Sequence, residues 1–184
     1  DLAILVRKKD QAAEIGKALS QEGFNLVSSE SILIAKSEKV KFLITFLKLS
    51  LNPDISEYHK IILDVIWEIF REDQEKYHKF ALENLHKKTS SFINSLGVYF
   101  DFTIKIEYLK VLSVFEAVNY ILICFPQIDP NEAYIHFFIE DICEFSKIKT
   151  GSISSYLRYW EVKSKQLHIS MTEDLEAIKL MTIH

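Results

Sequence analysis

Few residues of this sequence have the types and spacing that a catalytic, phosphate-binding or metal-binding site requires. Arg7 follows the continuous apolar run 3–6, and parallel α/β sheets bind their ligands at the end of such a buried strand. Arg7 is therefore either an ordinary charged strand end or a cation directed at phosphate. His136 precedes Glu140 and Asp141 at helical spacing, which supplies two potential metal ligands and no third. We interpret it as a surface or interface histidine.

Other catalytic signatures are missing from the sequence. It contains no GxxxxGKS/T phosphate loop, no GxGxxG and no nucleophile elbow. Trp67 and Trp160 fall on apolar stripes at helical spacing, which favours core packing over a platform for stacking nucleobases. His78 and His86 lie on a polar stretch and are interpreted as solvated.

The composition favours helices and argues against a basic nucleic-acid module. Hydrophobic residues make up 48% of the chain and charged residues 26%, with only 4 Gly and 3 Pro, so long helices are expected rather than a turn-rich β fold. The formal net charge is -4, whereas a domain that mainly grips phosphate backbone should be basic. The small lysine clusters are interpreted as solvated helix faces: Lys36, Lys39 and Lys41; Lys87 and Lys88; Lys163 and Lys165.

Cysteine usage and hydropathy predict a cytoplasmic protein without membrane contact. Cys124 and Cys143 are isolated and fit neither a metal site nor a disulfide framework. No secretory leader is apparent, and apolar runs such as YILICF are far shorter than the roughly 20 residues that a bilayer requires.

The two ends of the sequence read as parts of one parallel sheet. Residues 3–6 predict a strand covered on both faces, and a helix follows over 10–22 with Gly23 at its end. FNLVSS predicts a second strand, which completes a βαβ unit, and AIKLMTI near the C-terminus predicts a third. Both ends look cut, so we expect a piece of a longer protein in which the first and last strands are neighbours.

The stretch between these strands is expected to be helical. One helix should begin after Ser37 and end near Ser50, and another should cover 73–88. The strongest start signals are a capping serine or aspartate, mostly followed three residues later by glutamate: Asp54 with Glu57, Ser113 with Glu116, Asp129 with Glu132, and Ser152. A short helix should include Phe92 and Leu96 before Gly97. Residues 100–108 alternate apolar and polar, which predicts either a strand or an extended connector.

The residues at both ends resemble two motifs of UvrD/RecB/AddA-like superfamily 1 DNA helicases. AILVRKKDQAAEIGKAL, followed by a glycine and a strand, resembles motif IV, and IKLMTIH resembles the first half of motif V. DPNEAYIHFFIEDICEFS and GSISSYLRYWEVKSKQLHIS resemble, more diffusely, the insertion of the AddA/RecB-like branch. The implied fold is mainly α with a small α/β part, a parallel sheet fragment of a RecA-like domain interrupted by an all-α insertion. The implied boundaries are 1–52 for the first part of domain 2A, 53–168 for a 2B-like insertion, and 169–184 for the return to 2A.

The resemblance also implies roles for individual residues. Arg7 matches the motif IV arginine that reaches the γ-phosphate of ATP held by the other RecA-like domain. Thr182 and His184 match the motif V pair that faces single-stranded DNA. Gln11 matches a motif IV glutamine to which we assign no role. The lysines that follow Arg7, in place of the commoner small polar residues, depart from the family pattern.

The expected parent is an ATP-dependent DNA helicase or helicase-exonuclease that uses ATP and Mg. Its partners would be DNA (a single strand and a duplex junction), the remaining helicase domains in cis, and a nuclease or helicase partner subunit. The chain alone, without Walker motifs, should be inactive. The alternatives are a non-catalytic helical protein-interaction domain and a metal-dependent hydrolase that uses His136 and Glu140.

Overall fold

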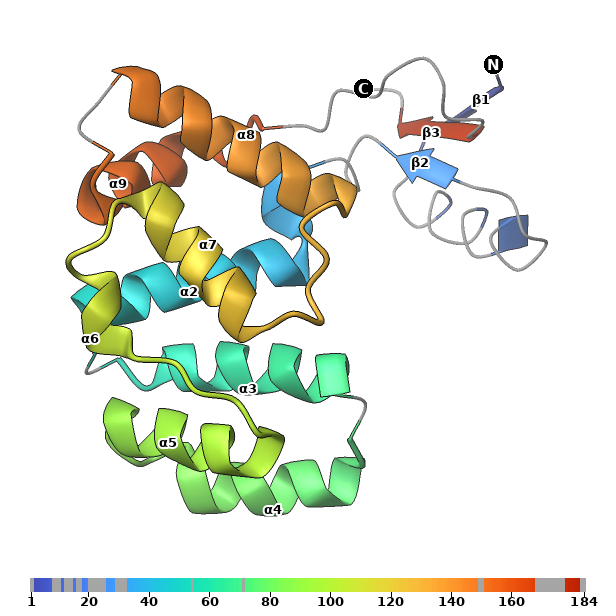
Figure 1. Cartoon of the computed structure of the whole chain (residues 1–184). Coiled ribbons are helices and arrows are strands. Elements are labelled where there is room, and N and C mark those ends of the chain that lie inside the picture. Colours follow the sequence, from blue (N-terminus) through green and yellow to red (C-terminus); the bar gives the residue numbers. More distant parts are fainter. Residues whose placement is uncertain are drawn as a thin grey trace.

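The computed structural model describes most of the chain as a helical body with a small sheet beside it (Figure 1). The described residues are 2–7, 11, 15, 18–19, 26–28, 33–53, 55–70, 72–148, 151–167 and 178–182. The strands are β1 (Ala3–Val6), β2 (Leu26–Ser28) and β3 (Ile178–Thr182). The helices are η1 (Ile34–Lys36), α2 (Glu38–Leu51), α3 (Glu57–Phe70), α4 (Gln74–Asn84), α5 (Thr89–Phe100), α6 (Ile106–Leu109), α7 (Val114–Cys124), α8 (Ala133–Ile148) and α9 (Ile153–Lys163).

The sheet joins the two ends of the chain. Its order is β1-β3-β2, and both pairs are parallel, with Val6 opposite Thr182 and Leu26 opposite Ile178. The last strand therefore lies between the two strands from the start of the chain. Parallel neighbours cannot be joined by a tight turn, and here the helical body lies between β2 and β3 in sequence. The prediction of a mainly α chain whose first and last strands are neighbours is confirmed.

One face of β1 is open. Leu5 is 59% exposed, whereas its neighbour Val6, whose side chain lies on the opposite face of the strand, is 7% exposed. Parallel sheets are normally covered on both faces. The prediction that both faces of β1 are covered is therefore wrong for this structure, in which Leu5 is exposed.

Helix α2 lies at the centre of the helical body. It contacts α3, α6, α7, α8 and α9. Neighbours on several sides bury most of the helix, including Phe42, Leu43 and Leu49. The ring of Phe42 meets those of Phe46 and Phe125 at centroid distances of 4.8 and 5.1 Å. In the expected domain boundaries α2 belonged to segment 1–52, yet its contacts above are with helices of the body.

Both tryptophans belong to the core, as predicted. Trp67 is 3% exposed and meets Phe100 edge-on at 5.1 Å, between α3 and α5. Trp160 is 7% exposed and meets Phe138 edge-on at 5.2 Å, between α9 and α8. Neither ring is free to stack on a nucleobase.

Most of the predicted helix starts are observed. The side chains of Ser37 and Ser152 cap α2 and α9, and Ser113 forms a complete capping box with Glu116 at α7. The start at Asp129 is displaced, because α8 begins only at Ala133. The carboxylate of Asp129 instead accepts a hydrogen bond from the backbone N–H of Asn131 at 2.8 Å. Asp54 lies outside the described residues.

The alternating segment 100–108 contains no strand, and its residues 101–105 form a connector between α5 and α6. Helix α5 continues past Gly97 to Phe100 and ends at Asp101, which has a left-handed backbone with φ of 55°. The N–H of Phe102 then donates to the carbonyl of Gly97 at 3.1 Å, and α6 begins at Ile106. Phe102 packs against the core, and Ile104 and Ile106 are buried in it, which explains the apolar alternation without any strand pairing.

The helical body closes where the chain enters and leaves it. The N–H of Ile34 donates to the carbonyl of Leu167 at 3.0 Å. We call this contact the neck. Two segments far apart in sequence are thus hydrogen-bonded at the base of the body, as a domain inserted between two strands requires.

Gly97 should be sensitive to the smallest substitution. A Cβ atom on Gly97 would lie 2.5 Å from the carbonyl oxygen of Phe102, so the α5 end must shift to accept it. We expect Gly97→Ala to lower the free energy of unfolding by about 1–3 kcal/mol, although alanine is the better helix former. Urea denaturation measures the change. The control is Val98→Ala at a site 80% exposed, which should change stability little; equal stability of the two variants would contradict the steric argument.

Candidate functional site

The carboxyl edge of the sheet brings together two of the predicted site residues. Arg7 directly follows β1, and Val6 is in register with Thr182, the last residue of β3. The backbones of Arg7 and Thr182 therefore lie at the same edge, on adjacent strands. The side chain of Arg7 is exposed. The third predicted residue, His184, lies outside the described residues, as do Lys8 and Lys9.

Among the described residues, this edge presents one exposed cationic side chain, that of Arg7. Ligands of parallel α/β sheets bind beyond the carboxyl ends of the strands, and a guanidinium is planar, permanently charged and suited to phosphate oxygens. Gln11 has a helical backbone and an exposed side chain, four residues beyond Arg7. A single cation at an open edge can contact a phosphate but cannot enclose it. Any phosphate chemistry here would need groups from a second surface.

The predicted metal pair does not form a metal centre. His136 Nε2 lies 3.3 Å from Glu140 Oε1, and the two side chains are 58% and 56% exposed. No group of three potential ligands is found among the described residues. The carboxylate of Asp141, the alternative partner of His136, is buried and accepts hydrogen bonds from two tyrosines of α9. A catalytic zinc is typically held by three protein ligands, and the described residues bring two together here. The exposure of His136 agrees with its interpretation as a surface histidine.

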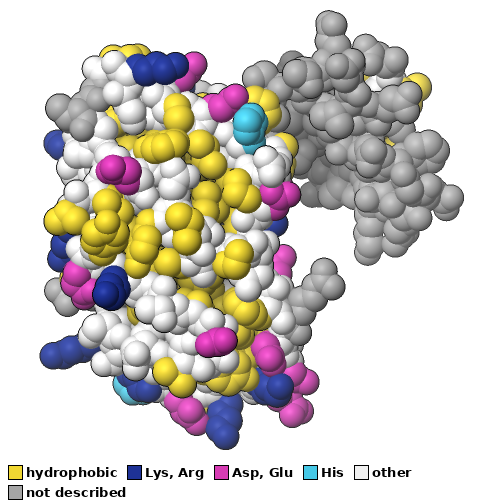
Figure 2. All heavy atoms as spheres, viewed as in Figure 1, with side chains coloured by type: hydrophobic (Ala, Val, Ile, Leu, Met, Phe, Trp, Pro, Cys, Tyr) yellow, Lys and Arg dark blue, Asp and Glu magenta, His cyan; other side chains and the backbone are white. Residues whose placement is uncertain are grey.

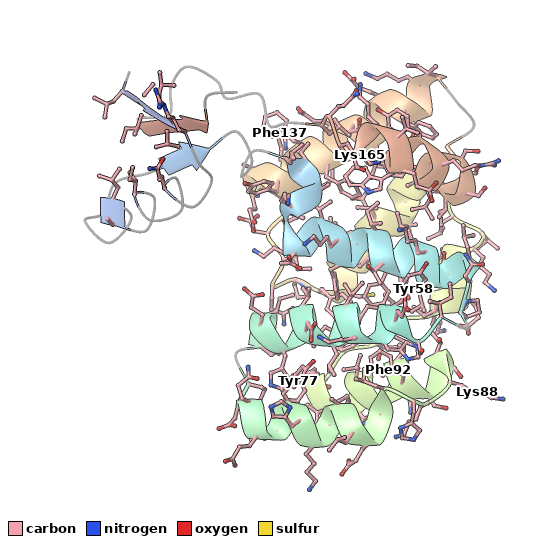
Figure 3. The ribbon with its side chains drawn as sticks, turned by 180° about the vertical axis from the view of Figure 1, so that it is seen from behind. Tyr58, Tyr77, Lys88, Phe92, Phe137 and Lys165 are labelled. Atoms are coloured by element: carbon pink, nitrogen blue, oxygen red, sulfur yellow. The ribbon has the colours of Figure 1, made fainter. Side chains whose placement is uncertain are left out.

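The lysine clusters do not merge into one basic surface. Lys39 forms an ion pair with Glu132, and Lys41 with Glu38 at 2.6 Å. Figure 3 shows Lys88 and Lys165 on widely separated parts of the helical body. These observations agree with the interpretation as solvated helix faces.

A hollow in the helical body also carries mixed charge. It has a volume of about 720 Å³ and lies between the start of α2, helix α3 and the start of α8. Its charged lining residues are Lys36, Glu38, Lys39, Glu68 and Glu132. Three carboxylates beside two ammonium groups make this hollow a poor site for a polyphosphate.

The sequence did not reveal a buried carboxylate cluster between α8 and α9. Asp141 is 8% exposed and accepts hydrogen bonds from the hydroxyls of Tyr156 at 2.9 Å and Tyr159 at 2.7 Å. Burial raises the pKa of Asp141 above its usual range, although both tyrosines stabilise the charged form. Burial next to this carboxylate also raises the pKa of both tyrosines. The spacing of Tyr156 and Tyr159 on one helix face was the only available signal, and it does not identify the partner.

The hydrogen bonds of this cluster connect α9 to α8. Its donors are used within the chain, and no described buried side-chain nitrogen or oxygen lacks a hydrogen-bond partner. A second buried polar group, His59, bonds the carbonyl of Leu85 and the hydroxyl of Thr89 and stacks on Phe92 at 4.2 Å. The Asp141 cluster connects α8 to α9, and the His59 cluster connects α3 to α5.

Comparison with known proteins supplies no relative. No protein-family model matches the sequence, and no curated protein is significantly similar to it. Within the described ranges, no helix combines the length and apolar character needed to cross a bilayer.

Asp141→Asn should change how stability depends on pH. Because the folded chain holds a proton on Asp141 more strongly than the unfolded chain, wild-type stability should fall as pH rises from the usual carboxyl pKa through the raised one. In the wild type, the free energy of unfolding should fall by about 1.4 kcal/mol for each unit by which folding raises the pKa of Asp141. Asparagine cannot ionise, so Asp141→Asn should not show this fall.

Urea denaturation between about pH 3 and pH 7 tests this difference. Glu161→Gln, an exposed carboxylate on α9, is the matched control and should follow the wild type. Parallel stability curves for the wild type and Asp141→Asn would show that the carboxylate ionises equally well in both states.

Proposed function

We propose that this chain is the part of a UvrD/RecB/AddA-like superfamily 1 DNA helicase that extends from motif IV to the start of motif V. In this proposal the sheet belongs to the RecA-like domain 2A, and the helical body is the 2B insertion. The observation that carries the proposal is the register of β1 and β3, which brings Arg7 and Thr182 to one sheet edge. The neck between Ile34 and Leu167 supports it, because an inserted domain must leave the sheet where it returns.

Arg7 would act on ATP bound by the other RecA-like domain. Its guanidinium would contact the γ-phosphate and stabilise the charge that spreads over the transferring phosphoryl oxygens. ATP and Mg would be held mainly by that other domain, which agrees with an edge at which Arg7 is the one exposed cation among the described residues. Thr182 and His184 would face single-stranded DNA, and hydrolysis would open and close the two domains along it.

The helical body would bind DNA or a partner protein and would not take part in ATP hydrolysis. It would regulate contact with the duplex junction or bind a nuclease or helicase partner subunit. Its described surface carries ion-paired lysines and no metal cluster, which suits a regulatory or binding role. The sequence contains no Walker A loop, so the chain by itself should not hydrolyse ATP.

A helical protein-interaction domain is the second candidate. Its support is the formal net charge of -4 together with a helical core that closes on itself. In that case the residues at the two sheet strands would match the helicase motifs by chance, and Arg7 would be an ordinary charged strand end.

The gene separates the two candidates directly. If the proposal is right, the codons that follow His184 should continue motif V with a Ser- or Lys-Gly-Leu-Glu stretch. Sequencing the reading frame measures this without any protein. An unrelated polar continuation would favour the interaction domain and remove the roles of Arg7 and Thr182.

In the parent protein, Arg7→Ala should abolish most ATP turnover while leaving the fold intact. We expect kcat for DNA-stimulated ATP hydrolysis to fall by about 10³-fold, as for other arginines that stabilise phosphoryl transfer. The melting temperature should not change, because the side chain is exposed.

Arg7→Lys should not restore turnover, since an ammonium cannot reproduce the bidentate guanidinium. Lys105→Ala, an exposed site on the helical body, is the control and should keep normal turnover. Normal kcat in Arg7→Ala, or ATP turnover by the isolated chain that Arg7→Ala removes, would refute the assignment.

A further inference from the structure

Helices α4 and α5 pack on the helical body mainly through α3 (Figure 1). One end of this contact is aromatic, because Trp67 of α3 meets Tyr77 of α4 and Tyr99 of α5, each at a ring-centroid distance of 5.5 Å. The other end lies next to the turn between α4 and α5 and is polar. There His59 of α3 is 2% exposed and hydrogen-bonds residues on either side of this turn. Figure 2 shows the outer surface of this body, and Figure 3 shows Tyr77 and Lys88 at opposite ends of these helices.

Both ring nitrogens of His59 face groups that can only accept a hydrogen bond. Nδ1 lies 3.2 Å from the carbonyl oxygen of Leu85, which has no proton to give. Nε2 lies 2.9 Å from the hydroxyl oxygen of Thr89. That hydroxyl donates its single proton to the carbonyl of Pro53, so its oxygen is left to accept from the ring. The geometry therefore fits a ring that carries a proton on each nitrogen.

A neutral imidazole can make only one of these two hydrogen bonds, because it carries one ring proton. With that proton on Nε2, the lone pair of Nδ1 faces the carbonyl oxygen of Leu85. With it on Nδ1, either Nε2 and the Thr89 oxygen face each other without a proton, or the hydroxyl turns to the ring and leaves Pro53. Each arrangement leaves a buried polar group without its partner, which is costly.

The surroundings of the ring favour a cation despite its burial. Burial opposes a charged ring, but hydrogen bonds from a charged donor are stronger than neutral ones. The ring also stacks on Phe92 at a centroid distance of 4.2 Å and an interplanar angle of 17°, and an aromatic face attracts a cation. Asp54 lies outside the described residues. The other titratable side chains of the adjoining segments are exposed, half-buried or bonded elsewhere: Glu57, Tyr58, Lys60 (to Asp64), Glu83, His86, Lys87 (to Asn84 and Ser95) and Lys88.

We propose that His59 is a proton-dependent link between α3 and the α4–α5 turn, complete when the ring carries two protons and broken on one side when it carries one. Through this link, pH would adjust how firmly the turn is held, while the aromatic contact around Trp67 keeps the α4–α5 pair in place. This inference does not rest on the helicase proposal, because it involves neither the sheet edge nor ATP.

A nitrogen–proton NMR spectrum of the histidine rings in the full chain tests the proton count. At about pH 7, where an ordinary histidine is mostly neutral, His59 should show a proton on each ring nitrogen. His86 is exposed and serves as the internal control, which should show a mostly neutral ring. A single ring proton on His59 at this pH would overturn the proposal, and this measurement requires no variant.

The dependence of stability on pH tests the link through unfolding. The folded chain binds the second proton through hydrogen bonds that the unfolded chain lacks, so wild-type stability should fall as pH rises from about 5 to about 8. His59→Phe keeps an aromatic ring that cannot ionise and should not show this fall. Relative to this variant, the equilibrium constant for unfolding of the wild type should rise about 10-fold further, as expected when one hydrogen bond to a charged group is lost. All other titrating groups are common to the two proteins.

Position 89 tests the arrangement of the two acceptors. Thr89→Val removes the accepting oxygen and should abolish the additional pH dependence, whereas Thr89→Ser retains the hydroxyl and should behave as the wild type does. His86→Gln is the control for a histidine outside the link and should also follow the wild type. Equal pH dependence of the wild type and His59→Phe, or an unchanged dependence in Thr89→Val, would contradict the proposal.

Discussion

The parallel pairing of β1 with β3 is the constraint on which the rest of the architecture depends. Two parallel strands run in the same direction, so the chain must travel back along the sheet before it can add the second one. In this protein the return path is enlarged into a helical body with its own core. The body starts and ends at the hydrogen bond between Ile34 and Leu167. The sheet therefore places one requirement on the helical body, which is that the first and last residues of the body lie close together.

Within the body, the burial of α2 organises the remaining helices. Because α2 is surrounded, each neighbouring helix needs only one apolar stripe to contribute to a common core, and its outer face stays free to vary. Buried polar groups add contacts between neighbouring helices. Asp141 and His59 each connect one helix to the element that packs beside it, through hydrogen bonds that an apolar contact would not orient.

The amino-acid sequence specified locally encoded features well. Serine caps at 37, 113 and 152 depend on neighbouring residues only, and all three are observed. The tryptophans at helical spacing are buried as expected. Segment 100–108 was ambiguous for a physical reason: apolar side chains that face a core alternate in a connector as they do in a strand, and only the partner strand distinguishes the two.

Long-range features were harder to predict from the sequence. The start of α8 is displaced because a turn competes with the first turn of the helix. In that turn the Asp129 side chain accepts a hydrogen bond from the backbone N–H of Asn131. The Asp141 cluster joins two helices, and spacing within one helix cannot reveal which carboxylate its tyrosines meet. At the sheet edge, the sequence supplied Arg7 and Thr182, but their proximity depends on strand order, which periodicity does not determine.

The neck has an evolutionary consequence. Since the chain enters and leaves the helical body at hydrogen-bonded positions, the distance that the intervening segment must span stays the same whatever its size. The entropy of closing such a loop grows only slowly with its length. A lineage can thus shrink, expand or exchange the whole helical module while the strands beneath keep their alignment, so sequence divergence should concentrate above the neck and spare the residues below it.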